Sequence, residues 1–229
     1  MTGGLPLIVT RPEPGNAATA RRARAMGFEV HAVPLFAAHP VDWRAPAAED
    51  FDALLLTSAF AARLAGPEIT RLQALPAYAV GDATGRAAEA AGLRVAMCGA
   101  AGAQQLLDAM ASRNICSILW LCGRDRTEFH ARGAAITPLP CYAVDPVPPP
   151  AEWTGLIAAP AVLLAHSPRA AKRMSDLVGA ARAHLSLAAI SPAAAAAAGE
   201  GWRDVAVAEQ PDDVAILAQA RALWHKGAK

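Results

Sequence analysis

The sequence has little of what marks several common functional classes. Only 5% of its 229 residues are aromatic and 18% are charged, and the formal net charge is +1. General nucleic-acid binders depend on a surplus of Lys and Arg over acidic residues, so the balanced charge argues against this class and leaves room only for a local basic cleft. The hydrophobic fraction of 54% suffices for a packed core and excludes a wholly disordered chain.

Metal-binding and membrane signals are also missing. The four cysteines form no CxxC pair and have no histidine at ligand spacing, so we expect reduced thiols in a cytoplasmic protein rather than a zinc or redox site. The apolar stretch Leu185–Ala198 is mostly alanine and contains Pro192. It is too short to span a membrane, and the apolar run Leu5–Val9 lacks the features of a signal peptide. We therefore expect no membrane partner.

A recurring pattern dominates the chain: a short apolar run, a small polar loop, and then a helical segment rich in alanine and arginine. Leu7–Val9, Leu54–Leu56 and Val162–Ala165 are examples of the apolar run. Strands that are apolar throughout are buried on both faces, which is typical of a parallel sheet covered by helices. The predicted fold class is α/β.

Parts of the sequence resemble one another. Leu54–Ser58 is similar to Leu163–Ser167, and Val80–Ala88 is similar to the segment that starts at Ile190. Two opening units end in the proline-rich stretches 34–46 and 138–150. We infer two small domains joined by paired linkers. The pattern leaves open whether the halves are continuous or one domain is inserted in the other.

Candidate binding residues follow the predicted strands, because ligands of open parallel sheets bind beyond the carboxyl ends of the strands. These loops are rich in glycine and hydroxyl groups and precede helices, whose N-termini favour anions. Arginines there could add bidentate contacts to carboxylates, and each serine or threonine could equally be a simple helix cap. The candidates are Thr10, Arg11, Thr57, Ser58, Gly81, Asp82, Ala83, Thr84, Gly123, Arg124, Ser167, Arg169 and Ser191.

Familiar catalytic motifs are missing from these loops. Gly81–Arg86 lacks both the core of a Walker loop and the dinucleotide fingerprint, and no GxSxG elbow occurs. His166 beside Ser167 has no evident partner to orient it as a base, and the other five histidines are scattered, which favours surface or packing roles. Tyr142 lies in a predicted linker, where its phenol could donate a proton or anchor the hinge.

The motifs, in their order and spacing, resemble those of the uroporphyrinogen-III synthase family over nearly the whole chain. The segments that carry the resemblance are Thr10–Pro12, Leu56–Ala62, Ala79–Thr84, Leu121–Arg124, Cys141–Tyr142, His166–Pro168 and Ala189–Pro192. The resemblance implies two similar small domains, each a parallel sheet flanked by helices, joined by a two-segment linker. One domain would be discontinuous (1–35 with 149–229), the inserted domain would span 48–137, and the linkers would be 36–47 and 138–148.

The resemblance also implies an activity. The family closes linear hydroxymethylbilane into uroporphyrinogen III, with loss of water and inversion of the last ring through a spiro intermediate, and uses no metal or organic cofactor. Tyr142 matches the family's linker tyrosine, proposed to assist loss of the hydroxyl. Where many relatives have threonines after Pro192, this chain has Ala193 and Ala194. We expect backbone amides, including that of Ala193, to bind there.

The implied partner is a small anionic substrate, hydroxymethylbilane, with a possible transient hand-over from hydroxymethylbilane synthase. We expect a cytoplasmic monomer. Two alternatives remain at the level of the sequence. One is a non-catalytic two-domain binder of a tetrapyrrole or another small anion, and the other is a nucleotide-binding α/β enzyme.

Overall fold

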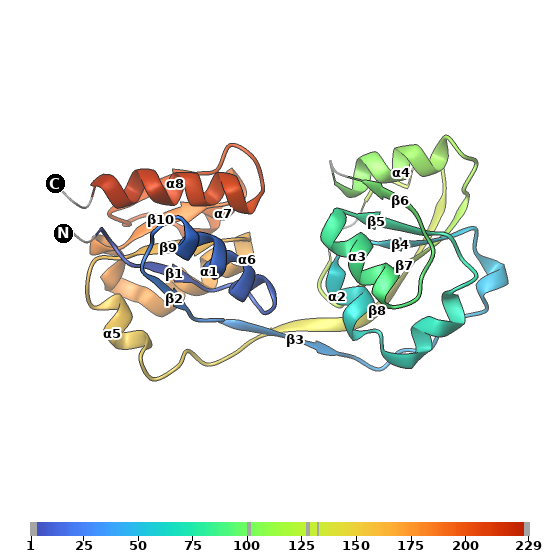
Figure 1. Cartoon of the computed structure of the whole chain (residues 1–229), viewed down its shortest axis with the longest axis horizontal. Coiled ribbons are helices and arrows are strands. Elements are labelled where there is room, and N and C mark those ends of the chain that lie inside the picture. Colours follow the sequence, from blue (N-terminus) through green and yellow to red (C-terminus); the bar gives the residue numbers. More distant parts are fainter. Residues whose placement is uncertain (1–3, 100–101, 127–128, 132, 227–229) are drawn as a thin grey trace. The chain divides into compact units, whose positions relative to one another are not determined.

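The computed structural model describes residues 4–99, 102–126, 129–131 and 133–226. The chain divides into two compact units, which we call unit 1 (Met1–Ala37 with Pro146–Lys229) and unit 2 (Ala38–Asp145). Each unit is a sheet flanked by helices (Figure 1), so the predicted α/β class is confirmed. The domain boundaries and linkers expected from the sequence stay a proposal.

Unit 1 contains a parallel sheet in which the first strand of the chain pairs with a strand from its last third. Leu7 of β1 lies opposite Val162 of β9 in this sheet. The strand order is β11-β10-β9-β1-β2, and every pair is parallel. The strands are β1 (Leu7–Val9), β2 (Val30–Ala32), β9 (Val162–Ala165), β10 (Ser186–Ala189) and β11 (Asp204–Val207).

Helices cover this sheet and explain its uniformly apolar central strands. Ala23 of α1 and Ile216 and Leu217 of α8 pack in one buried cluster with Leu7 and Val9. Burial on both faces favours apolar side chains at every position, as β1 and β9 show, and β10 is buried throughout with only Ser186 polar. The helices are α1 (Gly15–Ala25), α5 (Trp153–Ile157), α6 (Pro168–Val178), η3 (Gly179–His184), α7 (Pro192–Ala198) and α8 (Asp213–Lys226).

The second sheet belongs to unit 2, apart from the start of β3 and the end of β8, and has the order β3-β8-β7-β4-β5-β6. The pairings from β8 through to β6 are parallel, and β3 completes the sheet beside β8, which makes it mixed rather than wholly parallel. The strands are β3 (Phe36–Pro40), β4 (Ala53–Leu56), β5 (Ala77–Val80), β6 (Val95–Gly99), β7 (Ser117–Gly123) and β8 (Ala135–Pro146).

Two clusters flank the second sheet, one on each face. Leu54 and Leu56 join one cluster, whereas Leu55 joins the other, as the two-residue period of a strand requires. Ala61 of α2 belongs to the first cluster and Met110 of α4 to the second. The helices are η1 (Ala48–Asp50), α2 (Ala59–Leu64), η2 (Gly66–Leu72), α3 (Asp82–Ala90) and α4 (Ala103–Ala111).

Strand β8 was not expected, because its segment is rich in proline. The N–H of Ala135 donates to the carbonyl of Cys116, at the start of the β7 edge. Since alternate residues direct their N–H groups to opposite sides, Pro138 and Pro140 lack an N–H only on the side away from β7. Proline is therefore compatible with this strand, and a segment predicted as linker extends the sheet.

No helix among the described residues is both long and apolar enough to cross a membrane.

Candidate functional site

The candidate residues fall into two sets, one in each unit, and in both sets they follow strands. Unit 1 carries Thr10, Arg11, Ser167, Arg169, Ser191 and Ala193. Unit 2 carries Thr57, Ser58, Gly81, Asp82, Ala83, Thr84, Gly123, Arg124 and Tyr142.

Three of the predicted serines cap the helix that follows them. The Oγ of Ser58 accepts the N–H of Phe60 at 3.3 Å, that of Ser167 accepts the N–H of Ala170 at 3.1 Å, and that of Ser191 accepts a first-turn N–H of α7 at 3.2 Å. All three have extended backbones, as an N-cap residue does. Each hydroxyl retains its own hydrogen for donation.

The loop before α3 is built on a glycine. Gly81 has a φ of +79°, a conformation that side chains disfavour. Its carbonyl accepts the N–H groups of Thr84 and Gly85, which leaves those of Asp82 and Ala83 as candidates for an anion. The exposed Asp82 carboxylate has the same sign as such a ligand, so binding there would use the backbone.

Two of the three predicted threonines are buried, and the third, Thr57, is half-buried. Thr10 is 1% exposed, and its Oγ1 lies 3.5 Å from the carbonyl oxygen of Leu164. Thr57 Oγ1 accepts the indole N–H of Trp120 at 3.1 Å, and Thr84 is buried. The hydroxyls of Thr10 and Thr57 therefore contact protein groups, which supports the fold.

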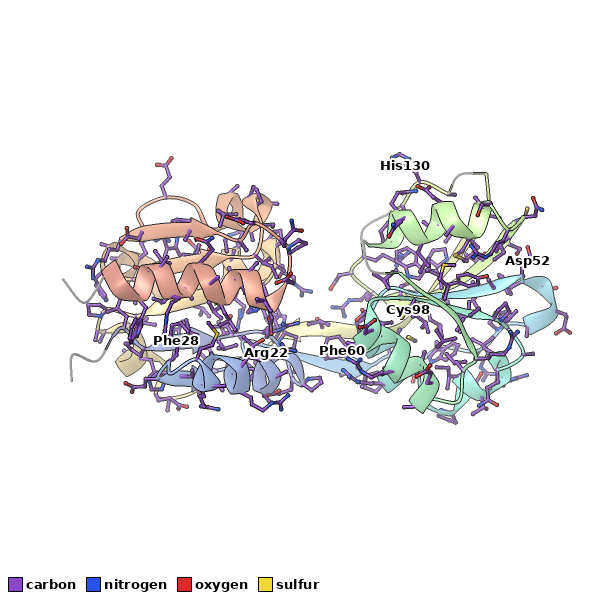
Figure 2. The ribbon with its side chains drawn as sticks, turned by 45° about the horizontal axis from the view of Figure 1, so that its top comes forward. Arg22, Phe28, Asp52, Phe60, Cys98 and His130 are labelled. Carbon is purple, nitrogen blue, oxygen red and sulfur yellow. The ribbon has the colours of Figure 1, made fainter. Side chains whose placement is uncertain are left out.

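Asp213, which the sequence analysis did not select, gathers polar groups at the strand ends of unit 1. Its carboxylate accepts hydrogen bonds from Arg11 at 3.0 Å and Thr19 at 2.8 Å, and it also binds Arg22, the α1 residue labelled in Figure 2. His166 Nε2 lies 3.1 Å from the same carboxylate. Arg11 and His166 follow β1 and β9, so the cluster joins two strand ends to α1 and α8.

Burial sets the charges of this cluster. The side chains of His166 and Asp213 are only 6% and 11% exposed. Burial lowers the pKa of His166, and this effect outweighs the hydrogen bond to Asp213, which raises the pKa. Burial alone would raise the pKa of Asp213, but the hydrogen bonds with His166 and Thr19 and the charge of Arg11 hold it well below its usual range. At neutral pH, a neutral imidazole therefore faces a charged carboxylate.

Arg169 lies in the first turn of α6 and lines a cavity of about 300 Å³ in unit 1. Its guanidinium lies 5.2 Å from the centre of the Phe36 ring. The neighbouring Lys172 pairs with Asp176 at 3.0 Å. Arg173 donates to the carbonyls of two connecting segments, at residues 35 and 147. Most of the positive charge around this cavity is therefore matched by protein groups.

Tyr142 is packed into unit 2. Its ring lies against Gly123, where a Cβ would come within 2.9 Å of the Tyr142 Cζ, and it lies 5.7 Å from the Phe60 ring. Burial raises the pKa of the Tyr142 phenol, although a hydrogen bond with the Ser58 side chain acts in the opposite direction. The phenol is protonated at neutral pH and can donate a hydrogen bond, but it is a reluctant source of a proton.

An exposed cluster lies next to Tyr142. The backbone N–H of Arg124 donates to the Tyr142 carbonyl at 2.8 Å, and its guanidinium binds Asp145. His39 Nε2 lies 2.8 Å from the other oxygen of Asp145. Hydrogen bonds from Arg124 and His39 lower the pKa of Asp145 to about 2, and the bond with Asp145 raises the pKa of His39.

Sequence reasoning missed His39 and Asp145 because they lie 106 positions apart. The order of β3 and β8 in the sheet brings them together, and no local motif signals that order. Asp213 was missed for the same reason, since its partners Arg11 and Thr19 are 202 and 194 positions away.

Metal ligands do not gather in the described part of the chain: no three His, Cys, Asp or Glu side chains there could hold an ion. Cys122 and Cys141 are buried, and burial raises the pKa of Cys141 to about 12, so that thiol is unreactive. Cys98 and Cys116 are exposed.

Comparison with known proteins gives a family. The family model described as uroporphyrinogen-III synthase HemD matches residues 17–218. No curated protein sequence matches the chain. The crystal structure of a mutant uroporphyrinogen III synthase from the extremely thermophilic bacterium Thermus thermophilus is similar, with 16% identity and a TM-score of 0.51 over 96% of this chain and 99% of that chain. The wild-type structure from the same bacterium shares 17% identity, with a TM-score of 0.40 over 96% and 99% of the two chains. At such identity, the first likeness supports the fold alone.

Proposed function

Because the chain belongs to the uroporphyrinogen-III synthase family, we propose that it is a lyase that converts linear hydroxymethylbilane into uroporphyrinogen III. The family acts in porphyrin and haem biosynthesis on a small tetrapyrrole. The reaction eliminates water and closes the macrocycle with inversion of the last ring. The observation that carries this proposal is the match of the family model to residues 17–218.

The strand-end loops suit the anionic character of this substrate, which has an acetate and a propionate on every pyrrole. Ser167 and Ser191 in unit 1 have hydroxyl hydrogens to donate, and the Ser58 hydroxyl in unit 2 shares a hydrogen bond with the Tyr142 phenol. Arg11 and Arg124 are partly exposed and offer charge-assisted contacts to carboxylates. We assign substrate binding to these side chains.

Backbone amides complete the proposed set. After β5, the N–H groups of Asp82 and Ala83 lie in the first turn of α3. After β10, Ala193 is exposed in the first turn of α7, between a proline that has no N–H and Ala194, whose N–H donates to the cap. Backbone binding at both loops explains how Ala193 can replace a threonine.

The chemistry that remains is largely positional. The substrate loses its hydroxyl readily and closes unaided to the uninverted isomer, so the enzyme must present the substituted carbon of the last ring to the electrophile. The resulting spiro intermediate then rearranges. An orientation preference of about 3 kcal/mol would favour one isomer by more than a hundredfold. We assign Tyr142 a hydrogen bond to the leaving hydroxyl, consistent with its protonated phenol.

The instability of the substrate also favours a transient hand-over from hydroxymethylbilane synthase in the cytoplasm. Direct transfer would shorten the time in which the bilane closes to the wrong isomer. We propose that the chain acts as a monomer.

A coupled assay tests this function. Porphobilinogen and hydroxymethylbilane synthase are incubated with and without the protein, the products are oxidised, and the uroporphyrin isomers are separated by chromatography. We expect isomer III in the presence of the protein and isomer I in its absence. Isomer I alone from a folded sample, together with binding of the bilane, would instead assign the chain to non-catalytic tetrapyrrole binding.

A further inference from the structure

Strand β8 extends past the strand that it pairs with. Gly123, the last residue of β7, lies opposite Tyr142, and β8 continues to Pro146. At a rise of about 3.3 Å per residue, Asp145 lies about 10 Å further along the strand direction. Arg124, the first residue after β7, reaches forward to bind it. The exposed cluster therefore stands at the carboxyl edge of the second sheet, where ligands of such sheets bind.

His39 is an exposed member of this cluster. Its side chain is 45% exposed, against 9% for Tyr142 as a whole residue. Asp145 fixes Nε2 at 2.8 Å, while Nδ1 contacts only the carbonyl of the adjacent Pro40, at 3.1 Å on the surface. A carboxylate that fixes one ring nitrogen and supports the charged imidazole leaves the other nitrogen for proton transfer.

Such a group would accelerate the proposed reaction, because the hydroxyl departs more easily as water than as hydroxide. A buried phenol with a raised pKa is not such a group at neutral pH. A surface histidine paired with a carboxylate is. The groups that face His39 are Asp145, whose bond stabilises the imidazolium, and Arg124, whose charge opposes it more weakly.

We propose that His39 is the catalytic acid that protonates the leaving hydroxyl of the bilane, and that Asp145, held by Arg124, is its positioning residue. This assignment rests on the proposed function. The proton then comes from His39 rather than from the buried phenol of Tyr142.

The step is balanced in atoms and charge. Nδ1 exchanges its contact with Pro40 for the substrate hydroxyl and transfers its proton to that oxygen. The carbon–oxygen bond breaks, its electron pair departs with water, and the lone pair of the pyrrole nitrogen forms the double bond of the electrophile. After ring closure, the terminal pyrrole carbon releases one proton, which restores the imidazolium. The net products are the macrocycle and one water.

The test is the pH dependence of the single-turnover rate of isomer III formation, with enzyme in excess over hydroxymethylbilane. For the unaltered protein, the rate should fall as the pH rises through the pKa of His39, which lies above its ordinary value of 6.5. His39→Gln should lower the rate by about tenfold or more and remove this pH dependence. The matched control is His31→Gln, since His31 is 34% exposed and lies 3.7 Å from Glu29 in unit 1. It should leave the profile unchanged.

Asp145→Asn provides a second measurement, the pH profile, which should not shift if Asp145 has a purely structural role. Without the carboxylate, the pKa of His39 returns toward its ordinary value, and the descending limb of the profile should shift to lower pH. A rate for His39→Gln within about twofold of the unaltered protein, with the limb retained, would overturn the assignment and leave the synthase function intact. Isomer I alone from the unaltered protein would overturn both.

Discussion

The two units each contain a histidine paired with an aspartate, and the two pairs respond to their surroundings in opposite ways. His166 and Asp213 are 3.1 Å apart, with side chains 6% and 11% exposed. His39 and Asp145 are 2.8 Å apart, with side chains 45% and 39% exposed. The pKa of His166 is lowered by burial, whereas that of His39 is raised by its hydrogen bond with Asp145. Solvent access, rather than the identity of the partner, decides the direction.

This difference separates two roles. In unit 1, the neutral His166 completes the surroundings of a charged carboxylate that also binds Arg11 and Arg22. Such a cluster fixes the arginine at the strand end and holds α1 against α8. In unit 2, the exposed pair can change its protonation state without disturbing the core. The first pair is suited to holding a binding residue in place, and the second to exchanging a proton.

The largest difference between the two pairs is expected when the carboxylate of each pair is removed. We expect Asp213→Ala to lower the free energy of unfolding by about 2 kcal/mol, because the buried His166 and Thr19 lose their hydrogen-bond acceptor. The measurement is urea denaturation followed by circular dichroism. Asp145→Ala is the matched variant and should lower the midpoint far less, because its partners are exposed. Equal losses from the two variants would refute the distinction.

A second variant tests the packing beside the exposed pair. Gly123→Ala places a Cβ within 2.9 Å of the Tyr142 ring, so the ring must move. We expect a loss of about 2 kcal/mol in the free energy of unfolding and a slower formation of isomer III. Gly155→Ala is the control, since nothing lies within 4 Å of a Cβ there. An unaltered rate and stability for the Gly123 variant would show that the contact with Tyr142 is dispensable.

Some features of this structure could be predicted from the sequence, because they depend on residues that are close together in the chain. The run Leu54–Leu56 is apolar because helices cover both faces of its strand, and this alone predicts a parallel sheet. Ser58 and Ser167 cap helices through contacts two or three residues away. Such features depend on neighbouring residues, and a single sequence shows them.

The parts that sequence reasoning missed depend on the order of the strands. His39 meets Asp145 only because β3 lies beside β8, and Asp213 meets Arg11 only because the two ends of the chain share unit 1. The prolines of β8 favour a linker when only the sequence is known. The structure shows that they lie where an N–H would point away from β7. The candidate loops were thus predictable, whereas the carboxylates that organise them were not.

The pH dependence of stability should show the two histidines acting with opposite signs. Because the pKa of His166 is lowered on folding, its contribution is present above its unfolded pKa of about 6.5 and is lost as the pH falls. Because the pKa of His39 is raised on folding, its contribution is present below that value and is lost as the pH rises. His166→Gln should therefore flatten the loss of stability on acidification from about pH 7 to about pH 5. His39→Gln should flatten the loss from about pH 6.5 to about pH 8 and have the smaller effect, since His39 is exposed. Urea midpoints at each pH measure both, and slopes that change in the same direction would contradict the assignment.

The smallest effect, and the most direct one, is the titration of each ring. In proton–carbon NMR spectra, the His39 resonance should titrate above the ordinary value and the His166 resonance below it. Asp145→Asn should lower the pKa of His39 while the His166 titration stays in place, because the two pairs belong to different units. In Arg124→Gln, the loss of a nearby positive charge should raise the pKa of His39, although a weaker hold on Asp145 would act against this. A fall in the pKa would therefore show that the guanidinium acts mainly by positioning Asp145, and a rise would show that it acts mainly by its charge.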